Sequence, residues 1–399
     1  MFDDLNARIR AHGDRDPSRT ALEFAPVHLG MQRVGLTYGE VVERSEALAR
    51  ILARRMQHGE RALLLFPAAP EFTVSFLACL AAGVIAVPVP IPVDESALRR
   101  VVNVARDCAV TQIISLSFVH EFAASGAPEM RQLCQSYDWL LVDALGNVDA
   151  YEGVASGAGG ARRLPRISSD DIAFLQYTSG STSTPRGVTV THGNLMSNEA
   201  AIGDSFGVRP DSRIVSWLPL HHDMGLIGGM IQPLYAGASG VVLEPLSFVQ
   251  RPASWLETIS QERADISGGP NFAYELCTRK VTDEELASLD LSSWRVAFNG
   301  AAQVFPRTLR AFDERFRPAG FRPTSHVPCY GLAEGTLLVA GSSAAPATYK
   351  PFVTDSLEAG PAAGASTARP ASRESVTKGL YVAGAAEDPA TRRVPSARP

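Results

Sequence analysis

The stretch AFLQYTSGSTSTPRGVTVTHGN, residues 173–194, places eight residues, mostly Ser and Thr, between a short apolar run and Arg186-Gly187. Hydroxyl and backbone N–H groups gathered at the end of a strand form a concave set of donors for an anion such as phosphate. Gly180 and Gly187 permit close approach of the backbone, and Arg186 adds a permanent positive charge. The spacing lacks the Gly-Lys-Ser/Thr ending of the common nucleotide-binding loop. The segment predicts a phosphate-binding loop, and a Ser/Thr-rich surface loop is the alternative.

The order of apolar segments predicts an α/β fold with parallel sheets. Residues 62–66 are an apolar strand, 71–82 a buried helix and 84–89 a second strand, which is the parallel strand–helix–strand unit. Further along, the Gly-rich residues 267–271 are expected to form a turn between two helices.

One apolar segment, residues 72–92, is long enough to cross a bilayer. Gly83 divides it, and the three prolines near its end would break a membrane-spanning helix. A buried helix, a turn at Gly83 and a buried strand are therefore favoured over the membrane-spanning alternative.

Composition restricts the classes of function. The chain has 399 residues, 45% of them apolar and 20% charged, which predicts two or three folded lobes. The net charge of −5 gives no electrostatic reason to expect nucleic acid or an anionic membrane as a partner. Five scattered cysteines lack metal-ligand spacing and are expected to be reduced thiols. The N-terminal residues lack an apolar signal core, so we expect a cytoplasmic protein.

Four polar clusters each follow a short apolar strand: residues 178–187, 221–225, 299–302 and 330–335. In open parallel sheets, ligands bind beyond the carboxyl ends of the strands. We therefore expect the four clusters to converge on one crevice.

Five motifs, taken together and in this order, resemble the adenylate-forming superfamily, and most closely its fatty acyl-AMP ligases. They are YTSGSTSTPRGV (177–188), PLHHDMGLIGG (219–229), GGPNFAYELC (268–277), NGAA (299–302) and CYGLAEGTLLV (329–339). The phosphate loop and the Tyr-Gly-x-x-Glu motif are shared across the superfamily, whereas HHDMG and GGPNFAY point to the fatty acyl-AMP branch. The resemblance covers roughly residues 15–340.

The resemblance implies an α/β fold, the acyl-CoA synthetase-like large N-terminal domain, with two layered αβ subdomains and a small β-barrel-like part. Residues 1–341 would form this AMP-binding (adenylation) domain. Residues 342–399, rich in Ala, Gly, Pro and Ser, are expected to be an insertion-like and tail segment. Nothing after it resembles the hinge or the small C-terminal catalytic-lysine domain, and Lys350 and Lys378 lie in the wrong context. Adenylation by this chain alone is therefore expected to be weak or absent.

The resemblance also implies a two-step reaction. ATP with Mg²⁺ and a medium- or long-chain fatty acid would give an acyl-adenylate and pyrophosphate. The acyl group would then pass to the thiol of an acyl carrier protein or of a polyketide or peptide synthetase. Three alternatives stay open: an acyl- or aryl-CoA ligase, an amino-acid adenylation domain, and a non-catalytic substrate- or carrier-binding module.

A carboxylate that attacks the α-phosphate brings two anions together, so the reaction requires positioning and charge neutralisation. By resemblance, Thr182, His222 and Glu334 are the catalytic residues, and Thr182 and Glu334 supply oxygen ligands to Mg²⁺. ATP or AMP would contact Thr178, Ser179, Gly180, Ser181, Thr182, Arg186, Asn299, Gly300, Ala301, Tyr330 and Gly331. The fatty acid would contact His222, Asp223, Gly269, Pro270, Asn271 and Tyr274.

Several of these residues have structural alternatives. Tyr330 could be a core aromatic, His222 could hydrogen-bond in the core, and Asp223 could cap a helix that begins at the next residue. His221 stands where this branch more often has an aromatic residue and is taken as structural. Ala302 and Gly335 replace the usual Glu and Ala of the branch, two small departures near the base pocket.

Overall fold

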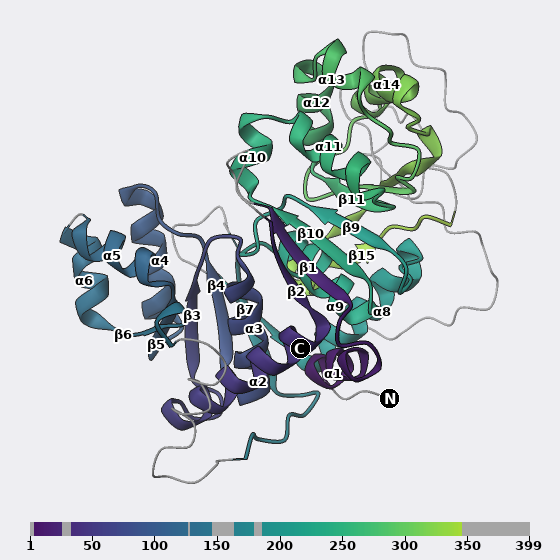
Figure 1. The fold of residues 1–399 in the computed structure, drawn as a ribbon. Helices are drawn as coiled ribbons and strands as arrows, with labels where there is room; N and C mark the ends of the chain where they lie inside the picture. The colour runs from purple at the N-terminus through teal and green to yellow at the C-terminus, as the bar shows by residue number, and fades with distance from the viewer. Residues whose placement is uncertain (1–3, 26–32, 127, 146–162, 179–185, 345–399) are drawn as a thin grey trace, which may run out of the picture.

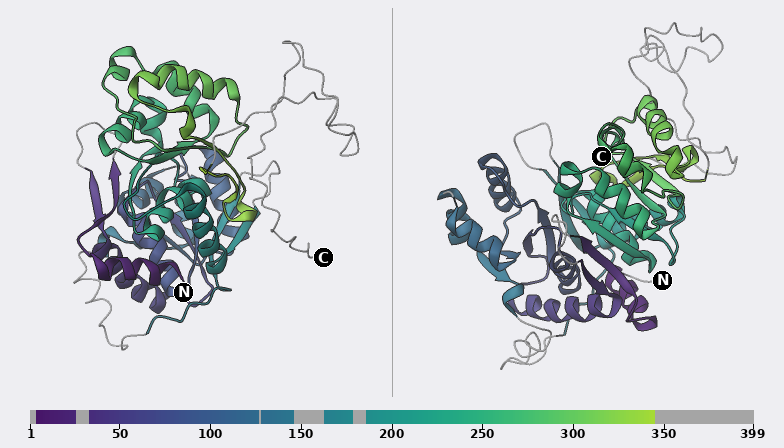
Figure 2. Two further views of the ribbon diagram at one scale, coloured as in Figure 1. Left: turned by 90° about the vertical axis from the view of Figure 1, so that its right-hand side faces the viewer. Right: turned by 45° about the horizontal axis from the view of Figure 1, so that its top comes forward.

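Two β-sheets, with helices between and around them, form the framework of the protein (Figure 1). The computed structural model describes residues 4–25, 33–126, 128–145, 163–178 and 186–344. Figure 2 shows a mostly blue lobe beside a mostly green lobe, each built on one of the sheets. The α/β class and the two layered αβ subdomains expected from the sequence are confirmed.

The larger sheet has seven strands in the order β13-β12-β11-β9-β10-β1-β2. Every neighbouring pair is parallel except β1 and β2. The strands are Thr20–Ala25 (β1), Val34–Thr37 (β2), Arg213–Ser216 (β9), Ser239–Leu243 (β10), Ile266–Gly269 (β11), Val296–Asn299 (β12) and His326–Pro328 (β13). Two strands from the start of the chain thus complete the edge of a sheet whose other strands lie beyond residue 212.

The smaller sheet has six strands in the order β6-β5-β3-β4-β7-β8, of which only β7 and β8 pair antiparallel. They are Arg61–Leu65 (β3), Ile85–Val89 (β4), Gln112–Ser115 (β5), Asp138–Leu141 (β6), Ile172–Thr178 (β7) and Arg186–Thr191 (β8). A separate pair, β14 (Tyr330–Gly331) and β15 (Leu338–Ala340), stands where the barrel-like part was expected. These two strands do not form a closed barrel within the described residues.

The helices cover both faces of the sheets. In the first half they are Leu5–Arg15 (α1), Tyr38–Arg55 (α2), Pro70–Ala82 (α3), Glu95–Asp107 (α4), Ser117–Ser125 (α5), Pro128–Ser136 (α6) and His192–Phe206 (α8). A π-helix, Met224–Ile231 (η2), follows and runs directly into Gln232–Ala236 (α9). The others are Pro245–Gln250 (α10), Ala253–Glu262 (α11), Asn271–Lys280 (α12), Asp283–Ala287 (α13), Pro306–Phe316 (α14) and short 3₁₀ turns, among them Ala333–Gly335 (η5).

Helix α3 lies between the two sheets, and this position explains the apolar segment that imitates a membrane span. It contacts β3, β4 and β7 of one sheet and β1 and β2 of the other. A helix that is apolar on all sides is stable in water only when it is buried on all sides. It ends at Gly83, whose left-handed backbone (φ 69°) turns the chain into β4, as expected. No helix in the described ranges is both long and apolar enough to span a membrane.

The expected turn at residues 267–271 is wrong, because residues 266–269 form the buried strand β11 between β9 and β12. Glycine usually weakens a strand. Here a Cβ atom on Gly268 would lie 2.1 Å from the carbonyl oxygen of Phe298 in the neighbouring strand. The two glycines therefore permit a close approach of the backbones, and the apparent turn signal reflects that approach.

The sequence interpretation did not include α1, β1, β2, α5 and β8. Strand β8 is the most informative of these, since it converts the expected loop after β7 into the tip of a hairpin. The predicted boundary at residue 341 stays a prediction, because residues 345–399, with Lys350 and Lys378, lie outside the described ranges.

Substitution of Gly268 by Ala tests the close approach in β11. The added methyl group must displace the backbone of Phe298, so the free energy of unfolding should fall by at least about 2 kcal/mol in urea denaturation. Gly35→Ala in β2 is the matched control, since its Cβ would meet nothing closer than 3.7 Å and the change should stay within about 0.5 kcal/mol. Equal stabilities of the two variants would contradict the strand assignment.

Candidate functional site

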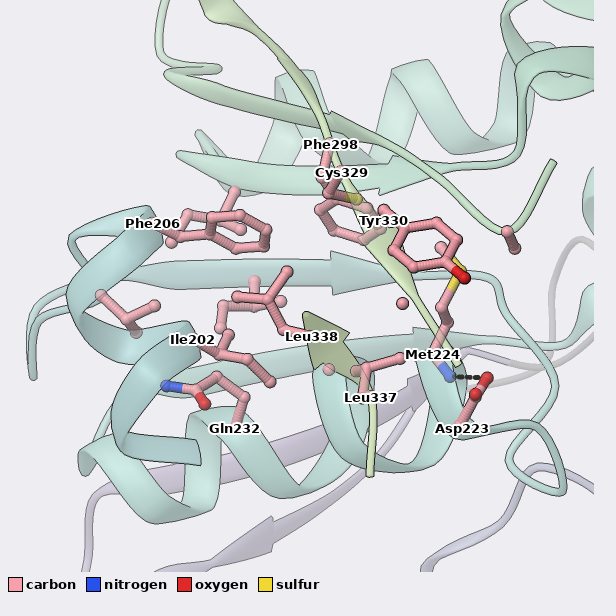
Figure 3. A pocket seen from close by; sticks show the side chains of 16 residues that line it. Ile202, Phe206, Asp223, Met224, Gln232, Phe298, Cys329, Tyr330, Leu337 and Leu338 are labelled. Carbon is pink, nitrogen blue, oxygen red and sulfur yellow. Dashed lines mark hydrogen bonds between the residues drawn. The ribbon is translucent and has the colours of Figure 1, made fainter. Parts of the chain in front are cut away.

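Three of the four polar clusters line one end of a single pocket, at the carboxyl ends of strands of the large sheet. Asp223 comes from the cluster after β9, Ala301 from the cluster after β12, and Tyr330 and Gly331 from the cluster after β13. Figure 3 shows Asp223, Met224 and Tyr330 together at one end of this pocket. The expected convergence on one crevice is confirmed for these clusters.

The first cluster lies on the β7–β8 hairpin. Thr178 and Arg186 are paired in the register of the two strands and form the last pair before the chain segment that connects them. The intervening residues Ser179, Gly180, Ser181 and Thr182 lie outside the described residues, so their predicted contacts stay predictions. The second strand of the hairpin, β8, lies against η5, the turn that carries Glu334.

The turn that carries Glu334 is held beside this hairpin by α8. The side chain of Asn198 donates to the carbonyl oxygens of Gly335 (3.2 Å) and Leu338 (2.9 Å) and accepts from the N–H of Leu338 (2.9 Å). A polar hollow lies between these elements, lined by Thr189 of β8, by Asn198 and by Glu334. The exposed Glu334 carboxylate thus stands in a hollow shared with the hairpin that bears the predicted phosphate loop.

The His221–Asp223 segment enters the site from β9 and is fixed by backbone contacts. Gln176 of β7 donates to the carbonyl oxygen of His221 (2.8 Å). The Asp223 carboxylate accepts the N–H of Met224 (2.7 Å), at the start of η2, and also lines the pocket. The capping role that was one alternative for Asp223 is therefore confirmed, and capping does not remove Asp223 from the site. π-Helical turns are uncommon and are often found at functional sites.

Burial sets the charge of this segment. It lowers the pKa of His221 to about 3, with a smaller contribution from His222, and it also lowers the pKa of His222. Both imidazoles are therefore neutral at pH 7. Burial raises the pKa of Asp223, and the nearby charge of Glu334 acts in the same direction. Among the described residues, no Lys or Arg side chain lines the pocket. Arg186 is not part of this lining and lies at the end of the β7–β8 pairing.

The last residue of β12 carries an unsatisfied polar group. Asn299 is completely buried, and neither its side-chain oxygen nor its nitrogen has a hydrogen-bond partner among the described residues. A buried amide without partners is costly, and such groups occur where a ligand or water completes them. Ala301 has a left-handed backbone (φ 60°), a strained conformation that is common at binding sites. Tyr330 is 60% exposed, which excludes the alternative of a core aromatic.

The residues predicted from GGPNFAY lie elsewhere. Asn271 is buried, donates to the hydroxyl of Thr308 (3.1 Å) and accepts the N–H of Phe305 (2.9 Å). Tyr274 is completely buried and donates its hydroxyl to the carbonyl oxygen of Phe298 (2.7 Å). Neither these two residues nor Gly269 and Pro270 line the pocket. Their role in substrate binding stays a prediction, while their contacts support β12 and α14.

The apolar part of the pocket was not foreseen from the sequence. Its walls come mainly from α8, η2, the large sheet and β15: Ile202, Phe206, Val208, Ile214, Met224, Gly228, Ile266, Phe298, Leu337 and Leu338. The sequence shows that these residues are apolar, but only the packing of α8 beside η2 reveals that they enclose a pocket.

Comparison with known proteins identifies the family. Residues 9–364 match the family described as AMP-binding enzyme. The chain belongs to this family. It is 41% identical, over 308 residues, to the medium-chain-fatty-acid–[acyl-carrier-protein] ligase JamA of Moorena producens, covering 76% of this chain and 50% of JamA. It is 34% identical to the corresponding ligase TtuA of Teredinibacter turnerae, covering 84% of this chain and 56% of TtuA.

A solved structure supports the fold and the branch. The fatty acyl-adenylate ligase of Legionella pneumophila, solved with acyl adenylate and pyrophosphate, superposes with a TM-score of 0.79 at 35% identity. The match covers 88% of this chain and 58% of the Legionella chain. The chain spans about half the length of the curated relatives it matches. The resemblance to fatty acyl-AMP ligases is confirmed.

One buried polar pair lies beside the apolar pocket. Gln232, at the start of α9, lines the pocket and is 1% exposed, and Glu199 of α8 is completely buried next to it. Burial raises the pKa of the Glu199 carboxyl well above its ordinary value of 4.5. The carboxyl is therefore protonated at pH values where an exposed glutamate is charged.

This protonation predicts a pH-dependent stability. Above pH 4.5 the unfolded chain releases the Glu199 proton while the folded protein keeps it, so stability falls as pH rises until the folded pKa is passed. The slope from this residue should be up to about 1.4 kcal/mol per pH unit. The variant Glu199→Gln has no titratable group at this position. Its free energy of unfolding, relative to that of the wild type, should therefore increase with pH. A pH-independent difference, measured by urea denaturation from pH 5 to 8, would contradict a protonated Glu199.

Proposed function

We propose that the protein activates a fatty acid with ATP, forming an acyl-adenylate and releasing pyrophosphate. The observation that carries this proposal is a pocket with two chemically different ends. One end has the exposed Tyr330 ring. The unpartnered Asn299 amide, at the end of β12, and a separate polar hollow beside the β7–β8 hairpin belong to the same polar clusters. The other end is apolar and lies between α8 and η2. A nucleotide suits the first end and an acyl chain the second.

At the nucleotide end, each polar feature matches a part of ATP. The exposed Tyr330 ring offers a face for adenine, and the Asn299 amide can exchange hydrogen bonds with the base edge. Thr178, Arg186 and the loop between them would face the phosphates, where N–H groups, hydroxyls and one guanidinium neutralise charge.

Mg²⁺ fits this end only as a partner of the phosphates. The described residues contain no group of three or more His, Cys, Asp or Glu side chains that could hold a metal ion by themselves. Glu334, with Thr182 and phosphate oxygens, would complete the coordination, since Mg²⁺ is usually held by one or two carboxylates plus substrate phosphates. The ion would neutralise charge on the phosphates during transfer.

At the other end, an acyl chain would be held by apolar contacts, with its carboxylate at the mouth near His222 and Asp223. A carboxylate oxygen would attack the α-phosphorus, the bond to the bridging oxygen of pyrophosphate would break, and pyrophosphate would leave. Neutral His222 can donate a hydrogen bond without repelling either anion. The acyl-adenylate formed would then react with a thiol and release AMP.

The names of the relatives support the substrate and the acceptor. JamA and TtuA are ligases of medium-chain fatty acids and acyl carrier proteins. We infer a fatty acid of medium length as the substrate and an acyl carrier protein or a synthetase carrier domain as the acceptor. A cytoplasmic location, expected from the sequence, stays part of the proposal.

Exchange of labelled pyrophosphate into ATP tests this function. Because adenylation by this chain alone is expected to be weak, any exchange should be slow, and it should depend on fatty acids of medium length and not on aryl or amino acids. Tyr330→Ala should raise the KM for ATP about tenfold, because loss of a base–aromatic stack costs about 1–3 kcal/mol. Tyr330→Phe is the matched control, which keeps the ring and should retain the KM.

Two further results of this assay separate the alternatives. Transfer to a holo carrier protein with no transfer to free coenzyme A is expected, and the reverse preference would identify a coenzyme A ligase. Lack of exchange with every acid, together with unchanged thermal stability on addition of ATP, would identify a non-catalytic module and overturn the proposal.

A further inference from the structure

The acyl pocket has a polar group at the end opposite its mouth. Figure 3 shows Gln232 near Ile202 and Phe206, at the far end of the pocket from Asp223 and Tyr330. Apart from this residue, the lining at that end is apolar. The Gln232 nitrogen has a structural role at the buried Glu199, but a hydrocarbon ligand would make no hydrogen bond with the rest of this amide.

The hydrogen bonds of Gln232 determine what it can offer a ligand. The side-chain amide of Gln232 can be placed in two orientations, and in one of them its oxygen would face the oxygens of Glu199. In the other orientation, Nε2 donates to the carbonyl oxygen of Glu199 (3.0 Å) and to Glu199 Oε2. The amide nitrogen has two hydrogens, and both are then directed at Glu199. The group left for a ligand is the carbonyl oxygen, which is an acceptor only.

Glu199 is arranged to keep this orientation. Its carboxyl is completely buried one turn before Ile202 on α8, so it stands directly behind Gln232. Oε2 accepts from Gln232, and Oε1 has no partner among the described residues. The Glu199–Gln232 pair thus fixes one acceptor oxygen beside the apolar lining.

We propose that the Glu199–Gln232 pair forms a specificity subsite for a hydrogen-bond donor, most simply a hydroxyl group, carried by the acyl chain far from its carboxylate. This inference rests on the proposed function, since it requires the acyl chain to occupy the pocket. A buried hydroxyl without a partner costs about 1–3 kcal/mol, and the Gln232 oxygen removes that cost for a donor. A methoxy group, which cannot donate, gains nothing from the same oxygen.

Binding of matched acids, measured by calorimetry on the full chain, tests the subsite. Saturated acids of eight to fourteen carbons are compared with the same acids bearing a terminal hydroxyl or a terminal methoxy group. For at least one chain length, the hydroxy acid should bind at least as tightly as the plain acid, and the methoxy acid about tenfold more weakly. In Gln232→Leu, the affinity for the hydroxy acid of that length should fall at least tenfold relative to the affinity for the plain acid.

Controls keep the result interpretable. Gln232→Met serves as a second variant of similar size, and near-UV circular dichroism checks that each variant is folded. Phe206→Leu changes the apolar lining and should affect plain and hydroxy acids alike. One result would overturn the subsite alone. In it, plain acids bind, and the affinity for hydroxy acids of every length is reduced by the same factor in wild type and in Gln232→Leu. Failure of wild type to bind any of the acids would overturn the subsite together with the proposed function.

Discussion

Three hydrogen bonds from the side chain of Asn198 hold α8 against β15 and the Glu334 turn, and the site depends on this attachment. Each bond contributes about 1 kcal/mol net, but together they fix the rotation and height of the helix. Because α8 begins at the end of β8, where Thr191 and Asn194 form a capping box, the same helix also positions the hairpin. The β7–β8 hairpin, the Glu334 turn and the apolar pocket therefore share one support.

Different faces of α8 contact different parts of the site. Asn198 faces β15, while Ile202 and Phe206, one and two turns further along, line the pocket, and Glu199 faces Gln232. Helix η2 closes the pocket from the other side, and its π-helical turn begins at Asp223 in the mouth. The two helices thus enclose an apolar space beneath a polar rim. This arrangement places an apolar pocket directly beside the polar clusters.

The sequence was sufficient for the parts of the structure that depend on local patterns. The helix, the turn at Gly83 and the strand after it follow from apolar content and glycine conformation, and the carboxyl-end clusters follow from their position after strands. It was insufficient where the outcome depends on distant residues. Gly268 resembles a turn residue until the backbone of Phe298 is placed beside it, and Gln232 resembles a helix residue until α8 is packed against it. Tyr274 is a motif residue whose predicted role at the substrate stays a prediction, and its complete burial could not be read from the motif.

The most direct measurement is a crystal structure of the chain with a stable acyl-adenylate analogue in which a sulfamoyl group replaces the phosphate. The account predicts adenine against the Tyr330 ring and an alkyl chain running between α8 and η2 toward Gln232. An alkyl chain outside this pocket, for example along residues 269–274, would contradict it.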